Sequence, residues 1–442
     1  MTKSSFDPRG LSRRGFLVGG LGAASIAVLA ACSPGGGSSS SGGSEPLPFW
    51  DMPWGSPGPD YIAAGKKVTG AYSPSGDLPG ATYQSIPWNN WLQTFSSAVA
   101  AGTGPALSTG GAFQSLQYYV QDAIHPADGV LKKLEASGKI DDFLPGTIDQ
   151  FNYNGVYTAL PWNVDARMFW YRKSLLEAAG VEVPTTWDEL HKAGLALKKN
   201  GVYGMIASGG GGGNAYQTLL SILFNNEGGL FNAAGEPDTM TDRNLEAVEF
   251  MMMLSKDGIF DPGSVSYSTA NVNEQFIAGK AAMSILPPDL DQSLENPELA
   301  ADTLIGSPLA SPNGTYGTQA YTSDLMMYTG GDWDTAAVEE FALYYLDAME
   351  EYWKLGVLNK IPVRQSTVDL PEVQANANLM KAIEEWLPVG RPLFSNADQA
   401  FPEINAVDGG QGITTWAQEV IQAEKSAEEV MQTLQNEIEK VM

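Results

Sequence analysis

Cysteine and histidine are nearly absent from this chain, which contains one Cys and two His among its 442 residues. With Cys32 alone, no disulfide can form within the chain, so the fold must be stabilised by packing. His125 and His191 are too few to supply a zinc site or a Cys-His nucleophile. The composition therefore excludes the commonest zinc-dependent and thiol-dependent enzymes, and we expect no metal and no cofactor.

Basic residues are also scarce, with 25 Lys and Arg against 51 Asp and Glu and a formal net charge of −26. Such a charge repels nucleic acid and anionic lipid head groups, so no nucleic-acid partner is expected. We interpret the acidity as a solvated surface suited to an extracellular setting. Aromatic residues, in contrast, are plentiful, including 11 Trp and 17 Tyr.

A long hydrophobic run is missing as well, because the apolar segment 16–31 is too short and too rich in Gly and Ala for the ~20 residues of a membrane span. Before it stands Ser12-Arg13-Arg14-Gly15-Phe16-Leu17, the signal of the twin-arginine export route, which moves folded proteins. It ends at Leu29-Ala30-Ala31-Cys32, which resembles the lipobox of bacterial lipoproteins. We predict that residues 1–31 are a twin-arginine lipoprotein signal peptide and that Cys32 carries the lipid anchor.

The segment that follows Cys32 is rich in Ser and Gly up to Ser44. This composition cannot bury a core and behaves as a flexible coil, so residues 32–48 are predicted to be a tether. Two acyl chains would hold such a protein stably at a membrane, which one chain would not. We expect the protein on the outer, extracellular face of the cell membrane, in contact with it through lipid only.

The remaining residues are too many for one compact core, which predicts two lobes. Short apolar runs at 49–52, 81–86 and 106–109 alternate with helical patterns at 61–72, 89–101 and from about 113. This alternation is typical of α/β units with a parallel sheet, whose ligands bind at the carboxyl ends of the strands.

Two helix starts and one glycine run stand out further along. Thr186 precedes Glu189 by three residues, and Ser426 precedes Glu429 in the same way, so both pairs predict capping boxes. The last helix would present an apolar stripe formed by Val430, Leu434, Ile438 and Val441. No Gly-Lys-Ser/Thr follows Gly209–Gly213, so we interpret this run as a mobile loop and not as a phosphate cradle.

Several blocks of sequence occur in one order: Gly104-Pro105, Tyr157–Trp162 followed by Phe169–Val181, Pro184–Leu190, and Phe276–Met283. Together they resemble family 1 of the extracellular solute-binding proteins that feed ABC importers, the group containing maltose-binding protein. The resemblance covers most of residues 49–442. It implies a two-lobed α/β fold of the periplasmic-binding-protein type II, in which each lobe is a sheet flanked by helices.

The resemblance also implies how the chain is divided between the lobes. Lobe 1 is expected to comprise 49–160 plus 320–355, and lobe 2 to comprise 161–319 plus 356–442. The chain would cross between them near Leu160–Val164, Tyr316–Gln319 and Leu355–Leu358, and the carboxyl-terminal helices would dock on lobe 2.

Ligand positions carried over from the family fall on polar and aromatic side chains near the expected cleft. Asp165 and Arg167 would share one face of a strand, where they can bind sugar hydroxyls, although a structural ion pair is the alternative. Two aromatic positions of the family differ here: the Trp that commonly follows Met283 is missing, and a second common Trp, near the carboxyl end, is replaced by Phe401. The predicted substrate-binding residues are Asp51, Trp54, Trp88, Thr109, Gly110, Phe113, Gln114, Trp162, Asp165, Arg167, Asn214, Tyr216, Asp289, Ser323, Asp324 and Phe401.

The resulting hypothesis is a lipid-anchored, monomeric receptor subunit that captures a mono- or oligosaccharide between its lobes for an ABC permease, without catalysis. The leading alternative is a secreted carbohydrate-active lipoprotein such as a glycosidase, because a pair of carboxylates suffices for that chemistry. A third possibility is a metal or polyamine receptor of similar build. With two histidines and no free cysteine, a soft-metal site is disfavoured.

Overall fold

The computed structural model describes residues 45–54, 58–88, 90–111, 113–210, 216–294 and 296–442. The predicted signal peptide, Cys32, most of the tether and Asn214 lie outside these ranges. None of the helices in the described ranges combines the length and the apolar character that crossing a membrane requires.

The larger of the two main sheets has eight strands in the order β13-β7-β12-β3-β1-β2, with β4 and β14 each paired to β12. The strands are β1 (Leu47–Asp51), β2 (Ala81–Ser85), β3 (Leu107–Gly110), β4 (Ile124–His125), β7 (Leu160–Ala166), β12 (Thr318–Tyr328), β13 (Ile361–Pro362) and β14 (Gly390–Arg391). β1 is parallel to β2 and β3, whereas β12 is antiparallel to β3 and β7, and β13 is antiparallel to β7. The carboxyl ends of β1, β2, β3 and β7 therefore meet the amino ends of β12 and β13 at one edge, which we call the shared edge.

Helices cover both faces of this sheet, as the alternation of side chains along β1 requires. Phe49 packs against Phe341 and Tyr345, with ring centroids 5.7 and 4.5 Å away, whereas Trp50 points to the other face and packs against Phe95 at 5.3 Å. The helices of this lobe are α1 (Pro59–Gly70), α2 (Trp91–Ala101), α3 (Gln114–Tyr119), α4 (Asp128–Ala136), α11 (Thr335–Ala348) and α12 (Glu351–Lys354).

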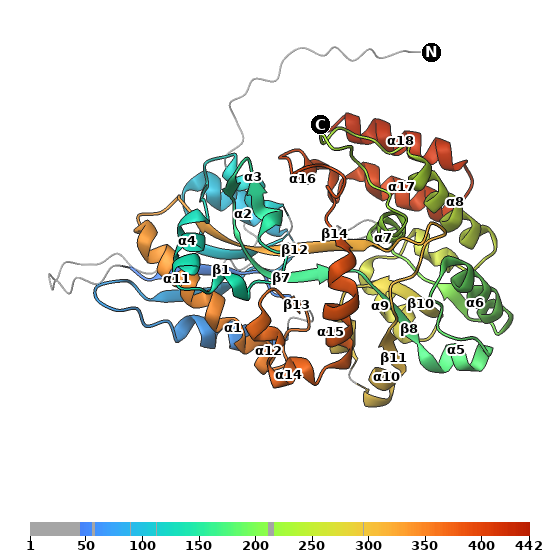
Figure 1. The fold of residues 1–442 in the computed structure, drawn as a ribbon, viewed down its shortest axis with the longest axis horizontal. Helices are drawn as coiled ribbons and strands as arrows, with labels where there is room; N and C mark the ends of the chain where they lie inside the picture. The colour runs from blue at the N-terminus through green and yellow to red at the C-terminus, as the bar shows by residue number, and fades with distance from the viewer. Residues whose placement is uncertain (1–44, 55–57, 89, 112, 211–215, 295) are drawn as a thin grey trace, which may run out of the picture. The chain divides into compact units, whose positions relative to one another are not determined.

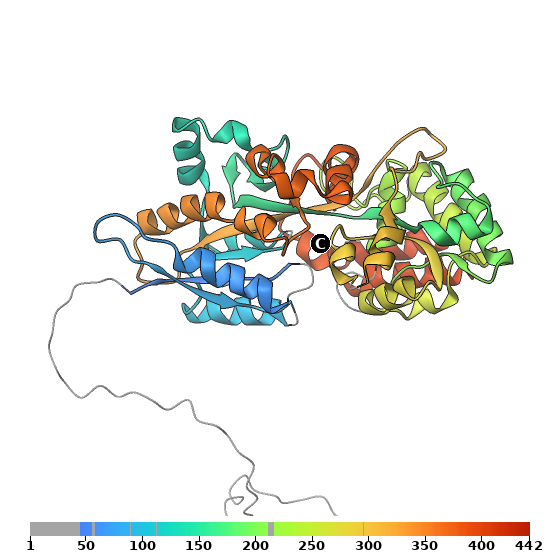
Figure 2. The ribbon, with the colours of Figure 1, turned by 90° about the horizontal axis from the view of Figure 1, so that it is seen from below.

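The smaller sheet has the order β11-β8-β10-β9, formed by β8 (Met168–Arg172), β9 (Tyr203–Met205), β10 (Ala281–Leu286) and β11 (Thr303–Ile305). Its helices are α5 (Lys173–Ala179), α6 (Trp187–Lys199), α7 (Gln217–Asn225), α8 (Asp242–Lys256), α9 (Thr269–Ile277) and α10 (Pro297–Asp302). The carboxyl-terminal helices α17 (Gln411–Gln422) and α18 (Ala427–Glu439) pack against α8, on the lobe of the smaller sheet (Figures 1 and 2).

Three segments carry the chain between the two sheets before β14, which pairs with the start of β12. Arg167 alone separates β7 from β8, and the second passage joins β11 to β12. The third passage follows β13 and runs through α13 (Gln365–Val368), α14 (Pro371–Gln374) and α15 (Ala377–Lys381), where α15 contacts β11 (Figure 1). A short π-helical segment, Ala382–Trp386, and α16 (Ile404–Val407) lead from there to α17.

Strand pairing shifts two of the expected boundaries. β7 pairs with β12 and β13 along residues 160–166, so the larger sheet extends past residue 160, where lobe 1 was expected to end. β13 lies at 361–362 in the same sheet, beyond the expected boundary at 355. The reason is that the chain leaves the larger sheet only after β7 has paired with β12 and after β13 has paired with β7.

Most of the elements expected in residues 49–119 are confirmed to within about two residues, from β1 to the start of α3. The capping box at Ser426 is complete. At α6, Thr186 accepts a hydrogen bond from the Glu189 N–H, but the Glu189 carboxylate binds the Thr185 N–H and hydroxyl instead of closing the box. Val441 follows α18 and is 46% exposed, so the apolar stripe ends at Ile438.

The mobile-loop interpretation does not hold for the first two glycines of the run at 209–213. Gly209 and Gly210 are buried, and their N–H groups donate to the carbonyls of Ser264 and Tyr267 at 2.7 and 2.9 Å. A Cβ at either position would lie within 3.0 Å of backbone oxygen, so this close approach requires glycine. Residues 211–213 lie outside the described ranges.

Candidate functional site

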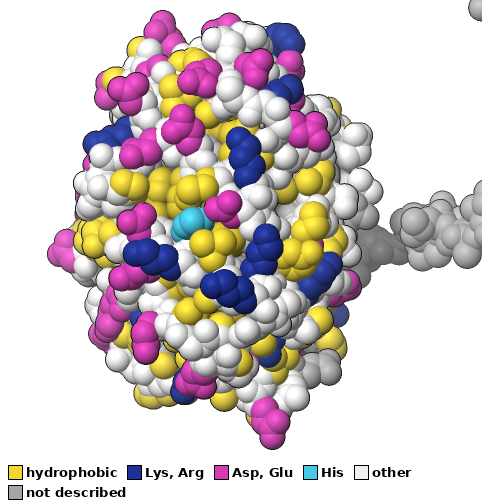
Figure 3. All heavy atoms as spheres, turned by 90° about the vertical axis from the view of Figure 1, so that its right-hand side faces the viewer, with side chains coloured by type: hydrophobic (Ala, Val, Ile, Leu, Met, Phe, Trp, Pro, Cys, Tyr) yellow, Lys and Arg dark blue, Asp and Glu magenta, His cyan; other side chains and the backbone are white. Residues whose placement is uncertain are grey.

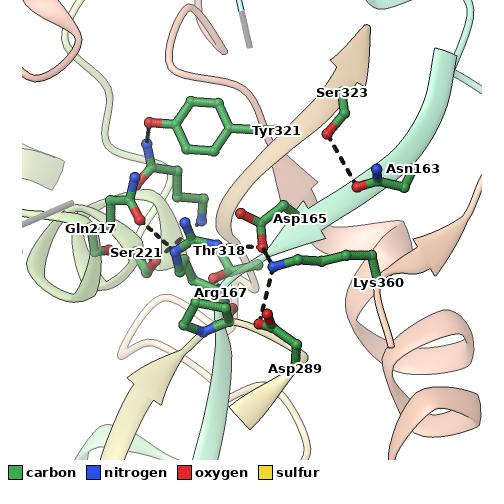
Figure 4. Close-up of polar contacts among 12 residues, drawn as sticks. Asn163, Asp165, Arg167, Gln217, Ser221, Asp289, Thr318, Tyr321, Ser323 and Lys360 are labelled. Atoms are coloured by element: carbon green, nitrogen blue, oxygen red, sulfur yellow. Dashed lines mark hydrogen bonds and ion pairs between the residues drawn. The ribbon is translucent and has the colours of Figure 1, made fainter. Parts of the chain in front are cut away.

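The shared edge brings Asp165 and Lys360 together through strand register. Ile361 pairs with Val164, so Lys360, one residue earlier, lies beside Asp165 near the end of β7. Lys360 Nζ donates to Asp165 Oδ1 at 2.7 Å and to Asp289 Oδ1 at 3.0 Å (Figure 4). Asp289 follows β10 of the smaller sheet, so this one ammonium group connects the two lobes.

Arg167 adds a second connection between the lobes. Its Nη1 lies 2.8 Å from Asp165 Oδ1, and its Nε donates to Gln217 Oε1 at 2.6 Å, at the first residue of α7 (Figure 4). We call Asp165, Arg167, Gln217, Asp289 and Lys360 the junction network. Asp165, Arg167 and Lys360 are at most 5% exposed, so these charges are almost completely removed from water.

The junction network pairs two carboxylates with two cations. Burial alone would raise the pKa of Asp165, but the positive charges of Arg167 and Lys360 outweigh it and hold that pKa below its usual value. Asp165 is therefore ionised at neutral pH. Removing one partner would leave a buried charge with less compensation, which is costly.

Aromatic side chains border the junction network. Lys360 Nζ lies 5.5 Å from the ring centroid of Trp54, which follows β1, in cation–π contact. Trp54 is 8% exposed, and its Nε1 has no hydrogen-bond partner within the described part of the chain. Trp88 packs edge-on against Trp54 with centroids 4.6 Å apart.

A second polar group lies on the other side of Arg167, whose guanidinium is 6.0 Å from the Tyr321 ring centroid. Asp408, after α16, accepts hydrogen bonds from the hydroxyls of Tyr216 and Tyr321. Burial raises the pKa of Asp408 and of both tyrosines. Phe113 packs against Tyr321 with ring centroids 6.2 Å apart, which connects this group to the loop after β3.

Asp51 and Thr109 lie inside the larger lobe. The Thr109 hydroxyl donates to Asp51 Oδ1 at 2.8 Å, and the hydroxyls of Tyr83 and Tyr352 donate to Asp51 Oδ2 at 3.0 and 3.2 Å. Burial raises the pKa of Asp51 to about 6, although these hydrogen bonds oppose the shift. The four groups form a closed polar cluster against α12.

Asp324, Gly110 and Gln114 meet where β12 pairs with β3. Asp324 lies opposite Gly110, and a Cβ on Gly110 would come within 2.4 Å of Asp324 Oδ1. Asp324 Oδ2 accepts the Ser115 N–H at 2.9 Å, near the start of α3. Burial nevertheless raises the pKa of Asp324 to about 7. On the opposite face of β12, Ser323 donates to Asn163 Oδ1 at 3.1 Å.

Besides the groups around Asp51 and Asp324, two expected aromatic residues lie outside the junction network. Trp162 is fully buried among Tyr345, Tyr352 and Trp353, in the core of the larger lobe. Phe401 packs edge-on against Phe231, with centroids 4.8 Å apart. The structure thus groups Trp54, Trp88, Asp165, Arg167 and Asp289, and through Tyr321 also Phe113 and Tyr216.

Sequence reasoning missed Lys360, Gln217, Tyr321 and Asp408. Lys360 stands alone between Asn359 and Ile361, in no motif, and only the two-residue strand β13 brings it to Asp165. Gln217 and Tyr321 lie within five residues of positions that were selected, Tyr216 and Ser323. Tyr321 lies within β12 opposite Asp165, so only the register of β12 on β7 identifies it.

Two surface cavities lie elsewhere and contain none of the expected site residues. One of about 450 Å³ is lined by residues that include Thr185, Ser307 and Tyr316, and one of about 410 Å³ by residues that include Leu355, Asn359 and Glu372. Across the described ranges, no three His, Cys, Asp or Glu side chains are grouped to hold a metal ion.

Comparison with known proteins gives two findings about similarity in sequence. Residues 81–351 match the family of bacterial extracellular solute-binding proteins. A binding protein of Brucella abortus (strain 2308) is 28% identical over 257 residues, which are 57% of this chain and 61% of the relative. The chain thus aligns with less than two thirds of that relative's length.

Solved structures extend the similarity over most of the chain. A sugar transporter from Arthrobacter chlorophenolicus A6, with bound laminaribiose, is 39% identical, covers 90% of this chain and 99% of its own, and superposes with a TM-score of 0.81. A maltose-bound protein of T. maritima, 17% identical, covers 90% and 100% of the two chains with a TM-score of 0.73, which shows a common fold. The predicted two-lobed α/β fold class is confirmed.

Proposed function

Because this chain belongs to the family of bacterial extracellular solute-binding proteins, we propose that it is the saccharide-binding receptor subunit of an ABC importer. Membership confirms the predicted family and the prediction that the protein is not an enzyme, since the family consists of solute-binding receptors. This membership contradicts the glycosidase alternative.

The observation that carries the saccharide proposal is the 39% identity, over nearly the whole of both chains, to a transporter structure with bound laminaribiose. The chemistry of the junction network supports it. Paired carboxylates, a guanidinium and a side-chain amide offer the acceptors and donors that sugar hydroxyls require, and Trp54 adds an aromatic surface. Two cations balance two anions there, which favours a ligand without net charge.

In the proposed mechanism, a saccharide binds between the lobes and shifts the population from open to closed. The passages from β7 through Arg167 to β8, from β11 to β12, and after β13 provide the hinge. A ligand can shift this equilibrium only by its greater affinity for the closed form. Asp165 lies on one side of the hinge and Asp289 and Gln217 lie on the other, so a ligand that contacts both sides favours closure.

The proposal includes export by the twin-arginine route and a lipid anchor on Cys32, which would hold the receptor near its permease on the outer face of the membrane. The motifs at Ser12–Leu17 and Leu29–Cys32 support this part. Six further predicted residues are proposed to contribute to saccharide binding indirectly, by supporting the loops at the shared edge. They are Asp51, Thr109, Gly110, Gln114, Ser323 and Asp324.

Calorimetry on the full chain tests the function. We expect a neutral saccharide from a panel that includes laminaribiose and maltose to bind with a dissociation constant on the order of micromolar, about −8 kcal/mol, and chelator to leave it unchanged. Absence of binding by every mono-, di- and oligosaccharide of the panel would contradict the proposal. Binding of spermidine, or binding that chelator abolishes, would favour the polyamine or metal receptor instead.

A further inference from the structure

Three tryptophans form a continuous row that begins at the junction network, and its middle member, Trp88, reaches the surface. Trp54 and Trp88 have ring centroids 4.6 Å apart, and Trp88 and Trp91 have centroids 6.1 Å apart. Exposure rises from 8% at Trp54 to 36% at Trp88. We call these three residues the tryptophan row.

The row follows from the topology of the shared edge. Trp54 comes three residues after β1, and Trp88 three residues after β2, the outermost strand of the larger sheet. Trp91 is the first residue of α2. Because Lys360 lies over the Trp54 ring at 5.5 Å, the inner end of the row touches the junction network.

Trp88 is held in place although it is exposed. Its Nε1–H donates to the Pro53 carbonyl at 2.6 Å, so its only polar group is satisfied. Gly111 packs closely against its ring, since a Cβ there would come within 3.1 Å. Trp91 packs on the smaller hydrophobic cluster around Phe95, but Trp88 belongs to neither hydrophobic cluster of the described residues. Core packing thus accounts for Trp91 and, through Trp54, for the covered part of Trp88, but not for the part of the Trp88 ring that faces solvent.

We infer that Trp88 forms an outer stacking subsite, and that the ligand is an oligosaccharide longer than a disaccharide. An indole ring stacks on the apolar face of a sugar ring, and a ring already fixed by its neighbours loses little entropy on binding. The inner sugar rings lie at Trp54 and the junction network, and the next ring lies on Trp88. This inference rests on the proposed saccharide-binding function.

The test is calorimetry on the full chain with laminari-, malto-, cello- and xylo-oligosaccharides of two, three and four sugar rings. In the parent protein, affinity for the accepted series rises with length. In Trp88→Ala the gain on lengthening disappears, about tenfold, whereas the affinity for the disaccharide stays within about twofold. Trp88→Phe keeps an aromatic ring and restores part of the gain.

Trp333→Ala is the matched control, because Trp333 is a partly buried tryptophan of the same lobe that follows β12 at the opposite edge of the sheet. It should keep the full dependence on length. Equal affinity for the di-, tri- and tetrasaccharide in the parent overturns the outer subsite but not the saccharide function. An equal loss for all lengths in Trp88→Ala shows that Trp88 only supports Trp54, which also overturns it. Failure of every series to bind contradicts the proposed function itself.

Discussion

At the scale of single residues, Lys360 connects more parts of the proposed site than its place in the sequence indicates. It is buried, contacts two carboxylates from different lobes and lies over Trp54, although a lysine in an extended segment usually points to solvent. Its main chain is fixed as well, since Trp353 Nε1 donates to the Lys360 carbonyl at 2.8 Å. Lys360 therefore links the two lobes through its hydrogen bonds to Asp165 and Asp289.

We predict that Lys360→Met lowers the free energy of unfolding by about 3 kcal/mol, because Asp165 and Asp289 lose a buried partner while Met preserves the packing of the stem. Urea unfolding without ligand measures it. Lys354→Met is the control, since its ion pair with Glu350 is solvent-exposed and should contribute no more than about 0.5 kcal/mol. Equal losses in the two variants would mean that the buried ammonium has no special role.

Asp324 gives a prediction for pH. Its folded pKa of about 7 lies above the unfolded value, so the folded state keeps the proton between about pH 4 and 7, and stability falls as the pH rises through this window. Asp324→Asn removes this titration. We expect the variant to match the parent near pH 4 and to be more stable by about 2–4 kcal/mol at pH 8.

Urea unfolding midpoints from pH 4 to 8 provide the measurement, with exposed Asp369→Asn as the control. If the unfolding midpoints of the parent and of Asp324→Asn depend on pH in the same way, Asp324 does not hold a proton in the folded state. Asp165 has the opposite sign: its folded pKa is depressed, so its contribution is present above about pH 4 and is lost as the pH falls further.

The sequence predicted Asp165 and Arg167 because they share a strand face and a family position. It could not predict Lys360 or Asp408, since each reaches its partner from more than 80 residues away along the chain. A contact of this kind depends on the final register of two strands or the path of a loop, and leaves no local pattern. Trp162 was predicted to bind substrate but lies in the core, because a core tryptophan and a tryptophan that stacks on a ligand look alike in sequence.

At the scale of elements, the helix starts and the longer strands were predictable because caps and apolar runs are local. The two-residue strands β13 and β14 were not, since two residues show no periodicity. The predicted boundary between the lobes at residue 355 was misplaced for the same reason. β13 carries the larger sheet beyond residue 355, and nothing in its composition distinguishes it from a loop.

The capping box of α18 gives a prediction at this scale. Ser426 accepts the Glu429 N–H, and the Glu429 carboxylate accepts the Ser426 N–H. Ser426→Ala should cost about 1 kcal/mol and increase hydrogen exchange in the first turn of α18. Thr433→Ala, which removes only a bond to the Glu429 carbonyl within the same helix, should leave both unchanged. Unaltered exchange in Ser426→Ala would show that packing against α8 alone fixes the helix start.

At the scale of the whole molecule, the net charge of −26 does not produce an acidic field on every face. Figure 3 shows the end of the molecule that carries α5 and α6, where basic, acidic and apolar side chains are interspersed. Near α6, His191 Nε2 lies 2.6 Å from Asp257 Oδ2, and Lys198 donates to the Asp257 carbonyl at 2.7 Å. Local pairing of this kind fits the interpretation of a solvated surface.

The proposed anchor gives a prediction for the whole molecule. Cys32→Ala removes the only thiol that can be acylated, so the protein should move from the membrane fraction to the soluble fraction after cell lysis. Ser33→Ala, next to it, should leave the distribution unchanged. Continued sedimentation of Cys32→Ala with membranes would refute the lipoprotein assignment.

The placement of α17 and α18 has a consequence for biosynthesis. The lobe of the smaller sheet begins at β8 but is covered by helices that end at residue 439, and Trp416, Val430, Met431 and Leu434 are buried there. A ribosome must therefore finish nearly the entire chain before this lobe can close its core. Until then the nascent protein exposes apolar surface on α8, so chaperones have a binding site from the synthesis of α8 until α17 and α18 are complete. A premature stop codon before α17 would yield a permanently incomplete lobe.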